Sequence, residues 1–132
     1  MRSRAMAGAG AFLLLFALGG CRSTPRTAQN FCRQLEKELP GIAEAPVTDE
    51  QITQAVRRFE RLNEIAPLEV EADWQALTTL MRAARDVDAN DTASVQALVD
   101  LSYSTERSAT AAAAWVASTC GVDIATGVSI AP

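Results

Sequence analysis

Residues 48–67, with the sequence TDEQITQAVRRFERLNEIAP, decide the fold class of this chain. Thr48 and Gln51 have the spacing of a capping box, in which two side chains satisfy free backbone N–H groups at the start of a helix. Apolar residues then recur at helical spacing until Pro67: Ile52, Ala55, Val56, Phe59, Leu62 and Ala66. A helix with one apolar face must bury that face against another element, so this segment predicts a domain built from packed helices.

Amphipathic segments are expected on both sides of this helix. An earlier helix begins at Ala28, follows an apolar stripe to Leu39 and should end at Pro40-Gly41, because proline and glycine both interrupt helices. A later helix enters through Pro67 and fades at residues 88–90. Each of these segments has apolar residues on one face, so each predicts a helix that packs against its neighbours.

The last helix is expected over residues 92–120. Asp91 or Thr92 would cap its start, and Gly121 is placed to end it in a left-handed conformation. A helix of this length spans roughly 40 Å, more than its neighbours, so a kink or break within residues 102–108 is one expectation.

No segment shows sustained alternation of apolar and polar residues, so no strand is expected. Four amphipathic segments with short connections predict an all-α fold, an antiparallel up-and-down four-helix bundle over residues 28–121. Residues 122–132 are expected to form an irregular tail.

Length and composition fit one folded domain. The chain has 132 residues, 48% of them hydrophobic and 21% charged. Removing residues 1–20, which contain Arg2, Arg4 and no acid, leaves 10 basic residues (12 less two) against 16 acidic ones, a net charge of −6. Nucleic acid is therefore not an expected partner.

The amino terminus has the pattern of an export signal. Arg2 and Arg4 precede an apolar core at residues 11–18 that is too short to cross about 30 Å of hydrocarbon. The arginines are not adjacent, so the general secretory route is expected. One interpretation is a plain secretory signal that is cleaved nearby, which would leave Cys21 as an ordinary thiol.

The core runs into Leu18-Gly19-Gly20-Cys21, which resembles the lipobox of bacterial lipoproteins. The resemblance implies removal of residues 1–20 and lipidation of Cys21. Several acyl chains on that residue would anchor the protein on the extracytoplasmic side of the cell membrane. Residues 21–27, CRSTPRT, would then be a short polar tether that keeps the domain close to the membrane surface.

The three cysteines are Cys21, Cys32 and Cys120, and lipidation of the first leaves an even pair. A disulfide between Cys32 and Cys120 would join the first and last helices across 88 residues and would persist in an oxidising compartment. The alternatives are two free buried thiols or a two-cysteine metal site, although neither histidine nor a fourth cysteine is present to complete a zinc site.

A second resemblance concerns the part after the tether. Phe31-Cys32, Ala66-Pro67-Leu68-Glu69-Val70 and Cys120-Gly121 resemble short motifs of small uncharacterised exported lipoproteins from high-GC bacteria. This resemblance implies a helical fold and brings no catalytic residue with it.

Polar residues interrupt the apolar stripe in the middle of the last helix. Counted at 100° per residue from Ala109, three of them fall within about 60° of that stripe, and one residue of the second helix also points inward. These four residues form a possible polar pocket: Asn63, Ser102, Thr105 and Glu106. A satisfied structural network, or a helix whose middle turns to solvent, would account for the same residues.

Two aromatic residues lie off the apolar stripe of the last helix and are possible partner contacts, Tyr103 and Trp115. For Trp115 the alternative is burial beneath the tail residues Val122 and Ile124 or the edge of the first helix.

Catalysis has little basis in the sequence. The chain lacks histidine, its one lysine, Lys37, lies in no Ser-x-x-Lys motif, and no glycine-rich phosphate loop is present. Asp86, Asp88 and Asn90 alternate as in the opening of a calcium loop, but the glycine and the closing glutamate of that motif are absent. We therefore expect no catalytic site, no metal and no cofactor other than the covalent lipid.

Together these features predict a membrane-anchored lipoprotein of the cell envelope. Its domain would be a non-enzymatic helical interaction module that contacts another envelope protein. The alternative is a lipoprotein that binds a small ligand in a polar pocket of the helical core.

Overall fold

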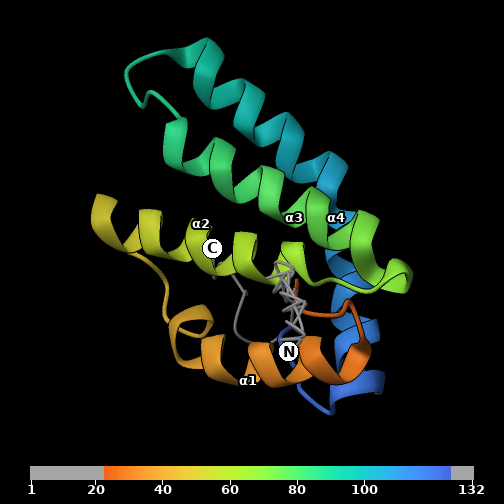
Figure 1. Cartoon of the computed structure of the whole chain (residues 1–132). Coiled ribbons are helices and arrows are strands. Elements are labelled where there is room, and N and C mark those ends of the chain that lie inside the picture. The colour runs from red at the N-terminus through yellow and green to blue at the C-terminus, as the bar shows by residue number, and fades with distance from the viewer. Residues whose placement is uncertain (1–22, 126–132) are drawn as a thin grey trace, which may run out of the picture.

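A computed structural model describes residues 23–125 of the chain. These residues form four α-helices and no strand: α1 (Ala28–Ile42), α2 (Asp49–Glu64), α3 (Leu68–Asp86) and α4 (Thr92–Cys120) (Figure 1). The all-α prediction is confirmed. The export signal, Cys21 and residues 126–132 of the expected tail lie outside the described residues, and residues 122–125 are not helical.

The caps expected from the sequence are present. Thr48 and Gln51 form the reciprocal capping box at the start of α2, and the Asp91 side chain accepts a hydrogen bond from the Ala93 backbone N–H at the start of α4. Gly121 ends α4 with φ of 68°, the left-handed region that favours glycine. The residues at each helix end therefore determine where these two helices begin and where α4 ends.

Two expectations about helix continuity were wrong. Pro40-Gly41 does not end α1, which continues to Ile42, because the Ala43 N–H still bonds the Leu39 carbonyl at 2.9 Å. Pro40 cannot donate the helical hydrogen bond to the Glu36 carbonyl, and α1 ends two residues later. Of the expected kink or break within residues 102–108, the break is absent, since α4 is one continuous helix.

The core lies where all four helices meet. Phe31 of α1 makes an edge-on contact with Trp74 of α3, with ring centroids 5.0 Å apart, and Phe59 of α2 stacks on the same indole at 5.4 Å. The buried cluster around these rings draws on every helix: Phe31, Leu35, Leu62, Ala66, Val70, Trp74, Ala112 and Val116. Aromatic pairs of this geometry add to the stabilisation from burial.

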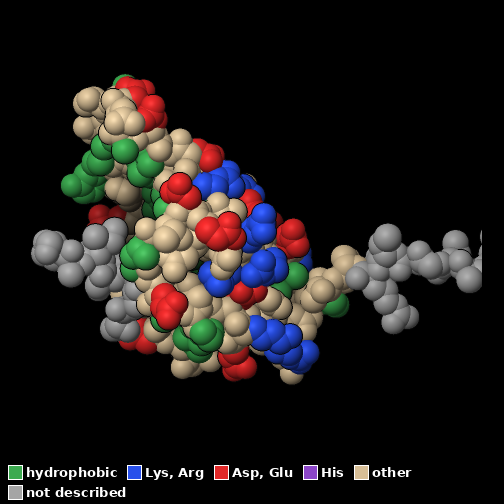
Figure 2. Space-filling model, turned by 90° about the vertical axis from the view of Figure 1, so that its left-hand side faces the viewer, with side chains coloured by type: hydrophobic (Ala, Val, Ile, Leu, Met, Phe, Trp, Pro, Cys, Tyr) green, Lys and Arg blue, Asp and Glu red, His purple; other side chains and the backbone are tan. Residues whose placement is uncertain are grey.

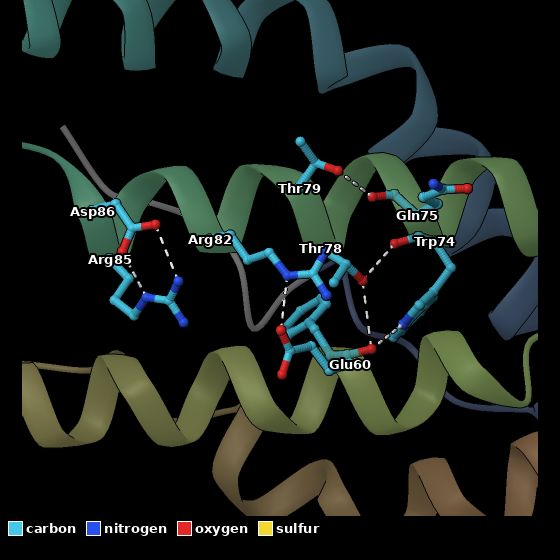
Figure 3. A network of polar contacts seen from close by, with 9 residues as sticks. Glu60, Trp74, Gln75, Thr78, Thr79, Arg82, Arg85 and Asp86 are labelled. Atoms are coloured by element: carbon cyan, nitrogen blue, oxygen red, sulfur yellow. Dashed lines mark hydrogen bonds and ion pairs between the residues drawn. The ribbon is translucent and has the colours of Figure 1, made fainter.

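Polar groups link α2 to α3 beside this core (Figure 3). The Phe59 carbonyl of α2 accepts the Trp74 indole N–H at 3.2 Å, and the buried Thr78 hydroxyl of α3 lies 3.4 Å from the same carbonyl. The Thr78 hydroxyl also donates to the Trp74 carbonyl of its own helix at 2.9 Å. Nearer the surface, Arg82 Nε donates to Glu60 Oε1 at 2.7 Å. The buried indole and hydroxyl groups are thus satisfied within the α2–α3 interface.

Each helix packs against two others, so the four helices form a closed ring of contacts. α3 packs against α2 and α4, and α1 also packs against α2 and α4. Figure 1 shows α3 and α4 as a hairpin whose looped end, at residues 87–91, lies away from α1. None of the helices in residues 23–125 is long and apolar enough to cross a membrane.

Candidate functional site

The Cys32–Cys120 disulfide predicted from the cysteine count is present. It joins α1 to the last residue of α4, with the two Cα atoms 5.3 Å apart. The bond holds the beginning of the first helix against the end of the last.

The four residues of the expected polar pocket do not come together. Thr105 is buried, but its hydroxyl donates to the Leu101 carbonyl of its own helix at 2.8 Å. Ser102 and Glu106 are exposed, so the expectation that they face the core was wrong. Asn63 of α2 is partly buried, and its Oδ1 has no hydrogen-bond partner among the described residues. This arrangement gives no support to a ligand pocket in the core.

Ser102 and Glu106 were expected to face the core because their angles on α4 were counted from Ala109. The buried residues Thr105, Ala112 and Val116 lie within about 40° of one another at 100° per residue. Ala109 lies at the edge of that buried stripe. Ser102 and Glu106 lie beyond the same edge, about 80° and 120° from Ala112, and therefore face solvent.

The two aromatic residues proposed as partner contacts have different surroundings. Trp115 packs against the core, with its ring centroid 5.5 Å from that of Phe31 in an edge-on contact, and Val122 and Ile124 pack against the same cluster. Tyr103 is 73% exposed. Of these two aromatic residues, Tyr103 is therefore exposed and Trp115 is partly buried.

Tyr103 continues an apolar stripe on the first half of α4. Val95 and Val99 precede it at intervals of four residues, so the three side chains share one face, and each valine is 38% exposed. This face belongs to the part of the α3–α4 hairpin nearest its loop. Figure 2 shows apolar side chains gathered at that end of the molecule and Lys and Arg side chains gathered lower on the same view.

A buried carboxylate between α1 and α2 was not expected from the sequence. Glu38 accepts two hydrogen bonds from Arg61, with Nε to Oε1 at 2.8 Å and Nη2 to Oε2 at 2.9 Å, and a third from Gln34 at 2.7 Å. Arg58 Nε lies 3.7 Å from the same carboxylate. The bond from Arg61 lowers the pKa of Glu38, opposed by burial and helped by Gln34.

The position of Glu38 on its helix was the signal that could have revealed it. Phe31, Leu35 and Glu38 form one buried stripe on α1, at spacings of four and three residues. Counting only apolar residues misses a charged member of such a stripe. Gly41 belongs to the same site, because a Cβ there would collide with the Arg58 guanidinium.

The segment expected to be a short polar tether, residues 21–27, is in part held on the helical body. Arg26 Nε donates to the Ala66 carbonyl at 2.8 Å, and Arg26 Nη2 lies 2.6 Å from Glu71 Oε1. Nearby, Asn30 Nδ2 donates to the Pro25 carbonyl at 3.0 Å. Arg26, next to the end of the expected tether at residue 27, is therefore held on the helical body.

No family model, curated protein or solved structure matches this chain. Within residues 23–125, no group of three or more His, Cys, Asp or Glu side chains is placed to hold a metal ion.

Proposed function

We propose that this chain is a lipoprotein of the cell envelope, anchored through a lipid on Cys21 to the extracytoplasmic side of the cell membrane. Its domain acts as a non-enzymatic helical interaction module. The observation that carries the proposal is the Cys32–Cys120 bond, because an odd third cysteine is then left directly after the export-signal pattern. A disulfide of this kind persists in the oxidising compartment outside the membrane.

We further infer that the four helices form an antiparallel up-and-down bundle. Short connections of three to six residues between consecutive helices support this arrangement. The contact of α1 with α4 also supports it, because the first and last helices are neighbours in that topology.

The surface through which the module contacts another envelope protein is the stripe of Val95, Val99 and Tyr103. An exposed tyrosine flanked by apolar side chains is a common anchor in protein interfaces, because it buries a large area at low cost in side-chain entropy. The stripe lies on the hairpin half that is distant from α1 and the tether.

One experiment in intact cells tests both parts of the proposal. Cys21→Ser should move the protein out of the membrane fraction and abolish metabolic labelling with a fatty acid, since the thiol is the lipid attachment point. In the lipidated protein, a photo-crosslinking amino acid substituted at Tyr103 should give a discrete crosslinked product.

The control position is Glu36, an exposed residue of α1 and therefore far from the stripe on the hairpin. The same photo-crosslinking amino acid at Glu36 should give no such product. Membrane retention of Cys21→Ser with its label intact would disprove the anchor. Equal crosslinking from both positions would disprove the surface, and a product of twice the mass of the protein would identify the partner as a second copy.

A further inference from the structure

A basic hollow lies between α1 and α2, beside the first of the described residues. Its volume is about 320 Å³, and its lining includes Thr24, Arg33, Lys37 and Arg61. Glu64 is the acidic residue of that lining. The cationic side chains therefore outnumber the anionic one in a protein whose net charge is negative.

Two cations of the hollow, Arg33 and Lys37, are available to an external anion. Arg33 and Lys37 lie four residues apart on one exposed face of α1, and neither forms an ion pair within residues 23–125. Arg61 is held at the edge of the hollow by its two hydrogen bonds to Glu38. That pairing fixes the guanidinium in place.

The hollow also lies close to the proposed anchor. Thr24, in its lining, is three residues after Cys21, which corresponds to at most about 11 Å of extended chain. The contacts of Arg26 with Ala66 and Glu71 hold the next part of the chain on the body, so the seven-residue tether cannot extend fully. A lipid on Cys21 would thus bring the face that carries the hollow to the membrane surface.

We propose that this face, with Arg33 and Lys37 as its free cations, seats on the anionic phospholipid headgroups of the membrane that holds the Cys21 lipid. The inference rests on the proposed anchoring. Phosphate groups of the lipids have the charge that the hollow requires, and each basic side chain near an anionic bilayer strengthens binding about fivefold. The seat gives the anchored domain one orientation, with α1 and α2 toward the lipid.

Lys37 provides a direct test because it is the single lysine of the chain. The lipidated full-length product is reconstituted into vesicles of phosphatidylglycerol and phosphatidylcholine, or of phosphatidylcholine alone. A water-soluble amine reagent is added, and the modification of Lys37 is followed by peptide mass. We expect modification at least about fivefold slower on the anionic vesicles, and 1 M salt should remove the difference because it shortens the screening length to about 3 Å.

Two variants with the same change in net charge test whether the protection of Lys37 depends on a charge at the hollow or on the net charge of the protein. Arg33→Glu should abolish the protection of Lys37, whereas Arg107→Glu, on the exposed face of α4, should leave it intact. An amine introduced by Arg107→Lys should react at the same rate on both kinds of vesicle.

Failure of this inference can be told apart from failure of the anchor. Intact mass first shows whether the purified protein carries lipid, and a protein without lipid would overturn the anchor and the seat together. Equal Lys37 rates on the two vesicles, in a protein that carries lipid, would overturn the seat alone. Equal loss of protection in Arg33→Glu and Arg107→Glu would show a net-charge effect and would also overturn it.

Discussion

Glu38 is the residue whose chemistry the fold constrains most. Its carboxylate is buried between α1 and α2 and accepts hydrogen bonds from Arg61 and Gln34. Because the bond from Arg61 lowers the pKa of Glu38 below its ordinary value of 4.5, the folded protein keeps this group ionised at a pH where the unfolded chain is protonated. The pair therefore stabilises the fold above about pH 4.5, and this contribution is lost as the pH falls through the lower folded pKa.

Glu38→Gln should lower the free energy of unfolding by about 1–2 kcal/mol at pH 7, because a charged hydrogen-bond acceptor is replaced by a neutral one. The difference between the variant and the wild type should shrink below pH 4.5. Urea unfolding at several pH values measures both effects. Glu36→Gln is the control, since Glu36 is exposed two residues away and should change stability by less than about 0.5 kcal/mol. Equal losses in the two variants would contradict this account of Glu38.

At the scale of the helix, the sequence predicted best what depends on neighbouring residues. The capping box of α2, the Asp91 cap and the Gly121 terminator all follow from residues within one turn of the helix end. The orientation of α4 did not follow, because its alanines, serines and threonines give little contrast between faces. Burial on that helix is decided by contact with α3 and α1, which no local pattern encodes.

Thr48→Ala should lower the free energy of unfolding by about 1 kcal/mol, because the N–H group of Gln51 loses its acceptor at the start of α2. Thr79→Ala removes the same hydroxyl from the exposed face of α3, where it only bonds the Gln75 carbonyl of its own helix. That variant should be neutral or slightly stabilising. Thermal unfolding of both proteins provides the comparison, and a loss for Thr79→Ala as large as that for Thr48→Ala would argue against the cap as the cause.

At the scale of the whole molecule, the cysteine count predicted the link between the two ends of the fold. The lipobox resemblance assigned Cys21 to the lipid, and parity then left Cys32 and Cys120 as a pair, although they are 88 positions apart. The contacts that Arg26 makes with the helical body could not be predicted from the cysteine count. Arg26 binds a backbone carbonyl at Ala66, and every residue type offers such a carbonyl, so no residue pattern marks the partner.

Reduction of the disulfide should lower the free energy of unfolding by about 4–5 kcal/mol, because the unfolded chain gains the freedom of an 88-residue loop. For a domain of this size the unfolding midpoint should fall by about 15–30 °C. Calorimetry with and without reductant measures the change. The double variant Cys32→Ser/Cys120→Ser should match the reduced wild type and should not respond to reductant. A midpoint that reductant leaves unchanged would show that the bond adds nothing to stability.

The hold of Arg26 on the body has a consequence for the timing of biogenesis. Its acceptor, the Ala66 carbonyl, is synthesised 40 residues later, which at about 5–20 residues per second is an interval of about 2–8 s. During that interval the contact of Arg26 with the Ala66 carbonyl cannot form. Once α2 and the start of α3 are complete, Arg26 is held by Ala66 and Glu71, five residues after the proposed lipid attachment point. The proposed cleavage and acylation at Cys21 would therefore compete in time with completion of the fold.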